Sequence, residues 1–127
     1  MIPVFFGLSG PELSDDERRL FAAAAPAGYI LFARNIVSPS QVRALTDELR
    51  HIAGGPRLPI LIDQEGGRVA RMRPPHWPEF PPQKVFGDAW KRAPQTAVKA
   101  AEANARAIAT MLSAAGVTVD CLPLLDV

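Results

Sequence analysis

The chain has a single cysteine, Cys121, among its 127 residues, so an internal disulfide is excluded. Because Cys121 lies in an apolar stretch, the sequence predicts a small buried residue there rather than a reactive thiol. The N-terminus has no basic stretch ahead of its short apolar run, which predicts a first strand and not a signal peptide. No run approaches the roughly 18 apolar residues of a membrane span. These features together predict a reducing, cytoplasmic setting.

An excess of charge of one sign is also missing. Fourteen Lys and Arg residues face thirteen Asp and Glu residues, which leaves a net charge of +1. Proteins that bind nucleic acid or an anionic membrane surface need a positive surplus, so we expect neither partner. An apolar content of 48% and a charged content of 21% are ordinary for a globular protein. We expect one compact domain over residues 1–127 and no second domain.

Apolar runs alternate with helical patterns along the chain. Four short runs predict strands, over residues 3–8, 28–32, 58–62 and 117–122. Three longer segments predict helices, over residues 15–25, 39–53 and 94–115. Ser14 and Glu17 have the spacing of a capping box, and Ser38 before Pro39 is a typical helix start. This alternation predicts an α/β fold with parallel strands and right-handed crossovers.

Each predicted helix should bury one apolar face against the sheet. In the first helix, this face contains Leu20, Phe21 and Ala24. The second and third helices carry longer stripes with a repeat of three to four residues. These stripes are Val42, Leu45, Leu49 and Ile52 in the second, and Ala97, Ala101, Ala105, Ile108 and Leu112 in the third. The small side chains of the third stripe should let that helix lie close to the strands.

Residues 63–93 show neither pattern and are expected to be irregular throughout. Five prolines between positions 74 and 82 are incompatible with a helix or a central strand. A loop of this length in a compact domain is usually functional or disordered. We expect Trp77 and Phe80 to pin it to the rim of the domain. The alternation of proline and aromatic residues also leaves open a polyproline II ligand for another protein.

Residues 58–71 are the most informative segment. A wholly apolar run ends at once in two carboxylates, two glycines and two arginines, where parallel sheets place their sites. Asp63 and Glu65 would point the same way if the strand continued that far. Gly66 and Gly67 permit positive φ and a close approach to a ligand. The plainer alternative is a structural turn with a solvated ion pair.

Asp63 and Glu65 also suggest the carboxylate pair of a glycosidase. Retaining glycosidases hold a nucleophile and a general acid about 5 Å apart, and a separation of two residues permits this distance. From the residues alone, this pairing remains open.

Three segments in order resemble the N-acetylhexosaminidase branch of glycoside hydrolase family 3. Asp63-Gln-Glu-Gly-Gly-Arg-Val69, followed by Arg71, resembles the signature of this branch. Gly28-Tyr-Ile-Leu-Phe-Ala-Arg-Asn35 is similar to the second strand of the family and its exit, and Asp120-Cys-Leu-Pro-Leu-Leu-Asp-Val127 to the fourth. The resemblance runs from about Val4 to Val127. It implies a partial (β/α)8 TIM barrel with about the first four strands and three helices, because a whole barrel takes about 250 residues.

The resemblance further implies retaining hydrolysis of terminal β-N-acetylglucosamine from cell-wall (peptidoglycan) fragments. In this family the nucleophile lies on a later strand, and a His/Asp dyad on a mobile loop is the acid/base. Neither motif occurs here, and His51 and His76 lie in other contexts. We therefore expect no catalytic residue in this chain, no cofactor, and no activity from the chain alone. A metal site built from Asp63, Glu65 and Asp126 is not expected, because hydrolysis in this family needs no metal.

Substrate binding is what the resemblance carries over to this chain. Asp63 matches an aspartate that accepts hydrogen bonds from hydroxyls of the terminal N-acetylglucosamine, and Arg71 matches an arginine that contacts the same sugar. Other polar residues at strand exits are expected to orient these two rather than to touch the sugar. They are Arg34, Glu65, Arg68 and Asp126. Arg73 is expected to face solvent.

Two rival functions remain. One is a non-catalytic half-barrel that binds a sugar or a protein partner. The other is a family 3 β-glucosidase, but the sequence of residues 63–69 favours the hexosaminidase branch. A half-barrel also leaves two strand edges without neighbours. The apolar residues expected to meet water there are Val4, Phe5 and Phe6 at one edge, and Val117, Val119, Leu122 and Leu124 at the other. We therefore expect self-association, or assembly with the remainder of the same enzyme.

Overall fold

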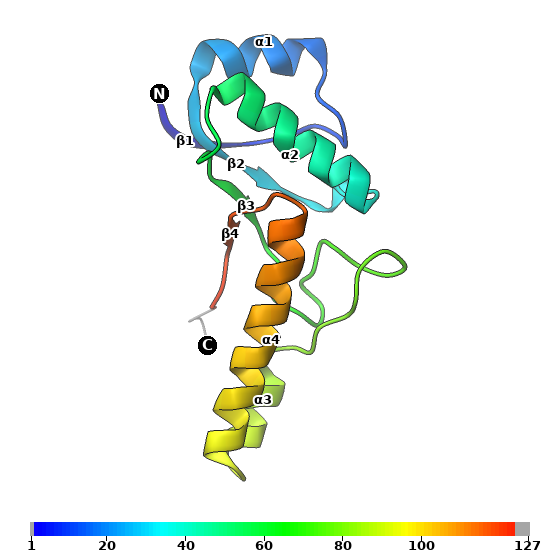
Figure 1. The fold of residues 1–127 in the computed structure, drawn as a ribbon, viewed down its shortest axis with the longest axis vertical. Helices are drawn as coiled ribbons and strands as arrows, with labels where there is room; N and C mark the ends of the chain where they lie inside the picture. The colour runs from blue at the N-terminus through cyan, green and yellow to red at the C-terminus, as the bar shows by residue number, and fades with distance from the viewer. Residues whose placement is uncertain (1, 124–127) are drawn as a thin grey trace.

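The chain forms four strands with helices between them, in a computed structural model that describes residues 2–123. In chain order the elements are β1 (Ile2–Gly7), α1 (Asp15–Ala24), β2 (Pro26–Leu31), the 3-10 helix η1 (Ala33–Asn35), α2 (Pro39–Ala53), β3 (Ile60–Ile62), α3 (Lys84–Trp90), α4 (Pro94–Ala114) and β4 (Val119–Asp120) (Figure 1). The predictions for Leu124 and Asp126 fall outside the described residues.

The four strands form one parallel sheet in the order β1-β2-β3-β4. One row of paired residues crosses the whole sheet: Gly7, Ile30, Leu61 and Val119. Sequential parallel order with the packed helices on one face is the arrangement of a β/α barrel, whereas doubly wound sheets place helices on both faces. The sheet is therefore an arc of a barrel, as the family resemblance implied.

The helix starts form as their local sequences predict. The Ser14 hydroxyl accepts a hydrogen bond from the Glu17 N–H at 3.2 Å, and the Glu17 carboxylate accepts from the Ser14 N–H at 2.9 Å. The same carboxylate accepts from the Ser9 N–H at 2.8 Å, which ties α1 to the exit of β1. Burial alone would raise the pKa of Glu17, but these hydrogen bonds from Ser14 and Ser9 outweigh it and lower the pKa to about 2.

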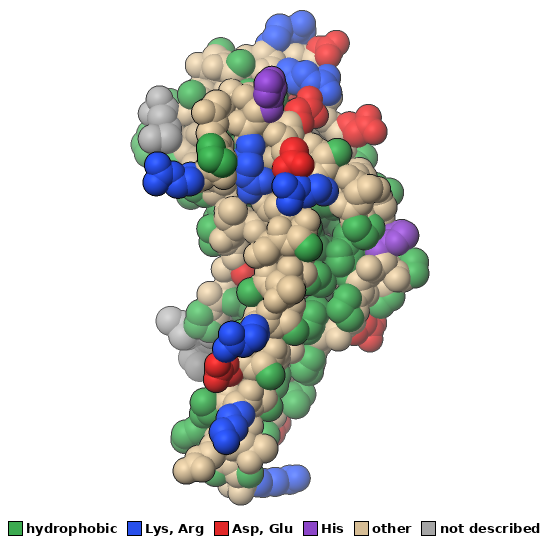
Figure 2. Space-filling model, viewed as in Figure 1, with side chains coloured by type: hydrophobic (Ala, Val, Ile, Leu, Met, Phe, Trp, Pro, Cys, Tyr) green, Lys and Arg blue, Asp and Glu red, His purple; other side chains and the backbone are tan. Residues whose placement is uncertain are grey.

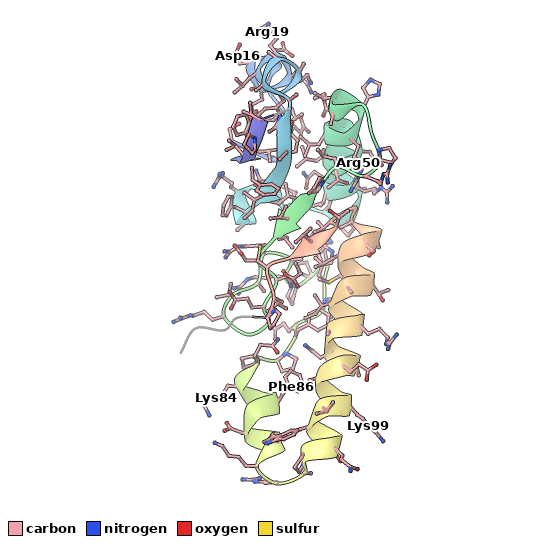
Figure 3. All side chains as sticks on the ribbon, turned by 90° about the vertical axis from the view of Figure 1, so that its left-hand side faces the viewer. Asp16, Arg19, Arg50, Lys84, Phe86 and Lys99 are labelled. Atoms are coloured by element: carbon pink, nitrogen blue, oxygen red, sulfur yellow. The ribbon has the colours of Figure 1, made fainter. Side chains whose placement is uncertain are left out.

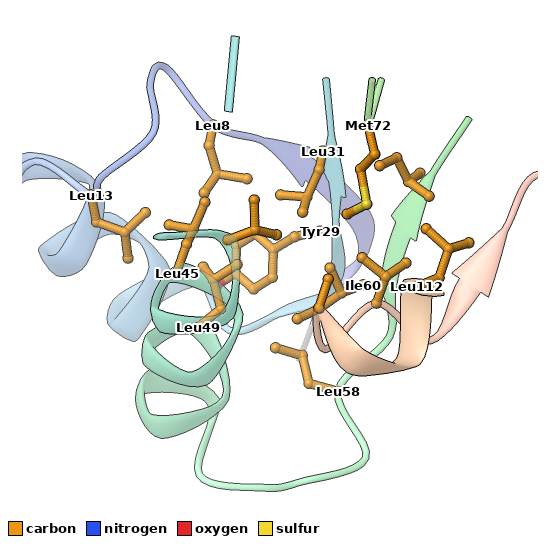
Figure 4. Packing of buried hydrophobic residues seen from close by; sticks show 14 of the residues in the cluster. Leu8, Leu13, Tyr29, Leu31, Leu45, Leu49, Leu58, Ile60, Met72 and Leu112 are labelled. Carbon is orange, nitrogen blue, oxygen red and sulfur yellow. The ribbon is translucent and has the colours of Figure 1, made fainter. Parts of the chain in front are cut away.

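One face of the sheet, called here the outer face, is sealed by helices. Tyr29, Leu31, Ile60 and Ile62 are fully buried on it. The Phe21 ring of α1 lies 4.8 Å from the Tyr29 ring. The helical residues in this core are Val42, Leu45 and Leu49 of α2, and Ile108 and Leu112 of α4 (Figure 4). Three residues of the stripe predicted for α2 therefore lie in the core, and so do Ile108 and Leu112 of the stripe predicted for α4.

The opposite, inner face is open over the described residues. Phe5 is 49% exposed and Val119 is 40% exposed, while Ile30 and Leu61 are half-buried. Val4 at the β1 edge is also exposed, as predicted. Phe6 and Leu122 were also expected to meet water, but they are partly buried against the core. Val117 was expected to meet water, but it is buried, because it precedes β4 and packs with Leu112 and Ala115 in the core cluster.

Three helical residues that were predicted to be buried are not fully buried. Leu20 is 54% exposed and lines an open hollow with Phe5 and Phe6 beside the free edge of β1. Ala24 is only half-buried. Ala105 is exposed, although Ala97, Ile108 and Leu112 of the same predicted stripe are buried. Helical periodicity shows which residues share a face but not how far the partner surface reaches.

The predicted irregular segment contains a helix, α3 at Lys84–Trp90. No proline occurs between Pro82 and Pro94, so the proline argument did not apply to this stretch. With the N-terminal half of α4, α3 forms an arm away from the sheet, in which Phe86 lies on the side toward α4 (Figure 3). Figure 2 shows hydrophobic side chains among charged ones along this arm. Within residues 2–123, no helix is long and apolar enough to cross a membrane.

Candidate functional site

Asp63 is the first residue after β3 and continues the alternation of that strand. The Cys121 N–H donates to the Ile62 carbonyl at 2.9 Å, so the ladder between β3 and β4 reaches this point. Asp63 therefore lies on the side of Leu61, at the carboxyl end of the inner face. Its side chain is 25% exposed. The barrel arc thus presents a partly shielded carboxylate where barrels place their sites.

Arg71, the other residue that the resemblance assigns to sugar binding, pairs with Asp63. The Arg71 Nη2 donates to the Asp63 Oδ2 at 2.9 Å, and the Arg71 side chain is 27% exposed. The Arg71 Nε is buried, and within the described residues it has no hydrogen-bond partner. The pair combines a carboxylate that accepts hydrogen bonds with a planar donor that has N–H groups to spare. That combination suits a ligand with several hydroxyl groups.

Gln64 holds the backbone of Arg71, a role that was not predicted from the sequence. Its side chain is 1% exposed, and its Oε1 accepts from the Arg71 N–H at 2.9 Å and from the Met72 N–H at 3.0 Å. Its Nε2 donates to the Met72 carbonyl at 3.0 Å. The signal that could have found it is a long amide placed at the first buried position beyond a strand exit.

The two glycines serve the packing of the Pro-rich segment. Gly66 and Gly67 have φ of +89° and +60°. A Cβ on Gly66 would lie 2.3 Å from the Pro81 carbonyl oxygen, and the Gly67 N–H donates to the Phe80 carbonyl at 2.7 Å. Trp77 is buried and Phe80 packs on the core, so the prediction that these aromatics pin the loop is confirmed. The close approach predicted for a ligand is made here by the chain itself.

Asp120 and Cys121 of the neighbouring strand border the same exit. The Asp120 Oδ1 accepts from the Gln64 N–H at 3.0 Å. Burial raises the pKa of Asp120, an effect that Asp63 and Glu65 strengthen and that hydrogen bonds from Gln64 and Cys121 oppose. Cys121 was predicted to be buried, but it is half-buried at the open carboxyl end of the sheet. Burial, followed by the charge of Asp63, raises the pKa of this thiol.

Arg34 lies at the exits of β1 and β2. Its Nε donates to the Leu8 carbonyl at 2.7 Å, and its guanidinium lies 4.8 Å from the centre of the Phe32 ring. Asn35, for which the sequence predicted no role, is fully buried and donates to the Leu8 and Gly10 carbonyls at 3.2 and 2.7 Å. These two side chains tie the β2 exit to the β1 exit.

The remaining predicted residues lie in the turn after Gln64. β3 ends at Ile62, so the strand alternation does not reach Glu65, whose N–H donates to the Val69 carbonyl at 2.9 Å. Arg68 is exposed. Arg73 is also exposed, as predicted, and donates to the Arg68 and Ala70 carbonyls at 2.5 and 2.8 Å. Within residues 2–123, the side chains of Arg34, Glu65 and Arg68 make no hydrogen bond to Asp63 or Arg71, and Asp126 lies outside this range.

Comparison with known proteins identifies the family. The family model described as "Glycosyl hydrolase family 3 N terminal domain" matches residues 4–127. The chain belongs to glycosyl hydrolase family 3. The segments that carry the resemblance in the sequence all fall within this match.

Relatives in family 3 match over nearly the whole chain. The Beta-hexosaminidase of Methylobacillus flagellatus is 39% identical over 124 residues, 98% of this chain and 35% of that protein. The Beta-hexosaminidase of Xanthomonas oryzae pv. oryzae is 40% identical over 123 residues, 97% of this chain and 36% of that protein. The chain therefore spans about a third of the length of these curated relatives.

Solved structures of family 3 share the fold. NagZ from Neisseria gonorrhoeae, in complex with N-trifluoroacetyl-D-glucosamine, matches with a TM-score of 0.91 and 34% identity over 98% of this chain and 36% of that chain. A family 3 β-N-acetylglucosaminidase from Paenibacillus sp. matches with a TM-score of 0.84 and 34% identity, over 97% of this chain and 23% of that chain. The arc of four strands is thus the start of a TIM-barrel-like family 3 domain.

Proposed function

We propose that this chain is the N-terminal part of a β-N-acetylhexosaminidase barrel, in which Asp63 and Arg71 hold the terminal N-acetylglucosamine unit of the substrate. The observation that carries the proposal is the 2.9 Å pair between the Arg71 Nη2 and the Asp63 Oδ2 at the carboxyl end of β3. The curated relatives named Beta-hexosaminidase and the complex of the neisserial NagZ with an N-acylated glucosamine support the substrate class.

The division of labour follows from the residue chemistry. The Asp63 carboxylate accepts hydrogen bonds from two neighbouring hydroxyls, and the free N–H groups of Arg71 donate to oxygen atoms of the same sugar. A nucleophile and a general acid belong, on this proposal, to the part of the barrel beyond residue 127. The two histidines of this chain, His51 and His76, are both exposed and lie outside the Asp63–Arg71 site.

The proposed setting is the cytoplasm, with saccharides from cell-wall peptidoglycan as substrates. The cysteine of the chain, Cys121, is a free thiol, which supports a reducing compartment. The alternative of a non-catalytic half-barrel makes a different prediction about the length of the protein. Comparison of the intact mass with the reading frame therefore decides between them: a frame that ends after Val127 favours the binding protein.

Kinetics of the full-length protein test the role of Asp63. Asp63→Ala should lower kcat/KM on a chromogenic N-acetylglucosaminide at least about tenfold, because hydrogen bonds to a charged acceptor are worth about 1.5–3 kcal/mol. Asp16→Ala, which removes an exposed carboxylate of α1, is the matched control and should leave kcat/KM unchanged. Wild-type kinetics for Asp63→Ala would remove Asp63 from the site.

The 127-residue chain on its own should show no turnover of the same substrate. Only binding groups are proposed here, whereas nucleophilic and acid–base catalysis supply much of the rate of a glycosidase. Turnover by chain that is free of longer species, and its loss in Glu65→Ala, would instead show that Asp63 and Glu65 are a catalytic pair.

A further inference from the structure

Gln64 is a buried junction between three segments of the site. Its backbone N–H is held by the Asp120 carboxylate of β4 at 3.0 Å. Its side-chain amide is held against Arg71 and Met72 by three hydrogen bonds of 2.9–3.0 Å. The side chain is 1% exposed, so water does not compete for these bonds. All three hydrogen bonds of the Gln64 side chain therefore end on the backbone of Arg71 or Met72.

We propose that Gln64 is a positioning residue for sugar binding, which sets the Arg71 guanidinium opposite the Asp63 carboxylate. This inference rests on the proposed function of Asp63 and Arg71. Arg71 is eight residues from its partner, across a turn that contains two glycines, so the Asp63–Arg71 ion pair alone does not fix the path of the backbone. The amide of Gln64 fixes that path by binding both the N–H of Arg71 and the N–H and carbonyl of Met72.

The chemistry of the site requires an amide at position 64. One oxygen must accept two backbone N–H groups, and a neighbouring atom must donate to a carbonyl. A methionine has the length of glutamine but offers neither strong interaction, so Gln64→Met removes the junction at nearly constant volume. A glutamate keeps the two acceptor interactions and regains the donor only when it is protonated.

Steady-state kinetics of the full-length protein test the proposal. Gln64→Met should raise KM about tenfold and change kcat less, because Arg71 is misplaced before the chemical step. In an Arg71→Ala background, the same substitution should have little further effect on KM. Thr46→Val is the matched control. Thr46 is fully buried in α2, outside the site, and its hydroxyl donates to the Ala115 carbonyl at 3.0 Å. It should lower Tm and leave KM unchanged.

A second variant keeps the test decisive if Gln64→Met does not fold. In Gln64→Glu, the ratio of kcat/KM between variant and wild type should rise severalfold as the pH is lowered, because the protonated acid restores the donor to the Met72 carbonyl. A ratio independent of pH, or full additivity of Gln64→Met with Arg71→Ala, would overturn the positioning role. If wild type itself neither binds nor hydrolyses the N-acetylglucosaminide, the proposed function fails instead, so the two failures are distinguishable.

Discussion

The two faces of the sheet carry similar apolar side chains, but they differ in what covers them. On the outer face, Leu31 and Ile62 are completely buried beneath the helices. On the inner face, Leu61 is half-buried and Val119 is 40% exposed. Neighbouring residues of the same strand therefore differ in burial only because they point in opposite directions.

This difference shows which face of the sheet the described chain can bury by itself. The helices that follow each strand return to the same face, so local connections seal the outer face. The inner face of a barrel is filled by side chains from all the strands, and a four-strand arc supplies only some of them. The site residue Asp63 lies at the end of this inner face, while the residue that organises its loop, Gln64, is buried.

The largest effect should come from a matched pair of leucine substitutions on the two faces. Leu31→Ala should destabilise the 127-residue chain by about 2–5 kcal/mol, because it leaves a cavity beneath packed helices. Leu61→Ala should cost about 1 kcal/mol, because its partly exposed side chain loses less burial. Urea unfolding of both variants measures the difference. Equal losses of stability in the two variants would contradict the difference between the faces and show that the inner face is covered.

Self-association is the next expected effect. The exposed edges at β1 and β4 should make the 127-residue chain associate in a concentration-dependent way, measurable by light scattering after size exclusion. Val4→Lys combined with Val119→Lys should reduce it, because charges at a strand edge oppose strand addition. Val98→Lys, on an exposed position of α4, is the control. A stable wild-type monomer at high concentration would contradict the prediction.

Lowering the pH should reduce the stability of the chain through Glu17, whose hydrogen bonds hold the start of α1 on the outer face. The pKa of Glu17 is lowered from 4.5 to about 2 by hydrogen bonds that exceed the effect of burial. Its contribution is therefore fully present above pH 4.5 and is lost as the pH falls toward 2. Glu17→Gln should lower stability by about 1 kcal/mol at pH 7 and flatten this part of the profile. Urea unfolding between pH 7 and 2 checks it, with Glu12→Gln on an exposed residue as the control.

A smaller effect should appear at Cys121, beside the site. Burial and the Asp63 charge raise the pKa of its thiol, so iodoacetamide should react more slowly than with a free cysteine at pH 8. Asp63→Asn should accelerate alkylation severalfold, because removing the charge lowers the pKa of the thiol. Asp47→Asn on α2 should leave the rate unchanged. Identical rates for wild type and Asp63→Asn would show that the two side chains do not interact.

The sequence predicted the site in part. The string after β3 and its resemblance to the family placed Asp63 and Arg71 together, and the structure joins them at 2.9 Å. The sugar-binding roles of Asp63 and Arg71 stay predictions, and so do the orienting roles of Arg34, Glu65, Arg68 and Asp126. Gln64 and Asp120 escaped notice because their importance lies in contacts across the loop and the next strand, and no local pattern reports such contacts.

Local physics explains what the sequence by itself determined: the alternation of strands and helices apart from α3, the capping box of Ser14 and Glu17, and the end of α2 at Gly54 with φ of +70°. These features depend on residues within about one helical turn. Only the tertiary structure decided that Leu20 and Ala105 are exposed, that Val117 is buried, and that Gln64 holds Arg71. Burial and long-range hydrogen bonds depend on which surfaces meet in the folded protein. Hydrophobic periodicity shows only which side of a helix or strand can be buried.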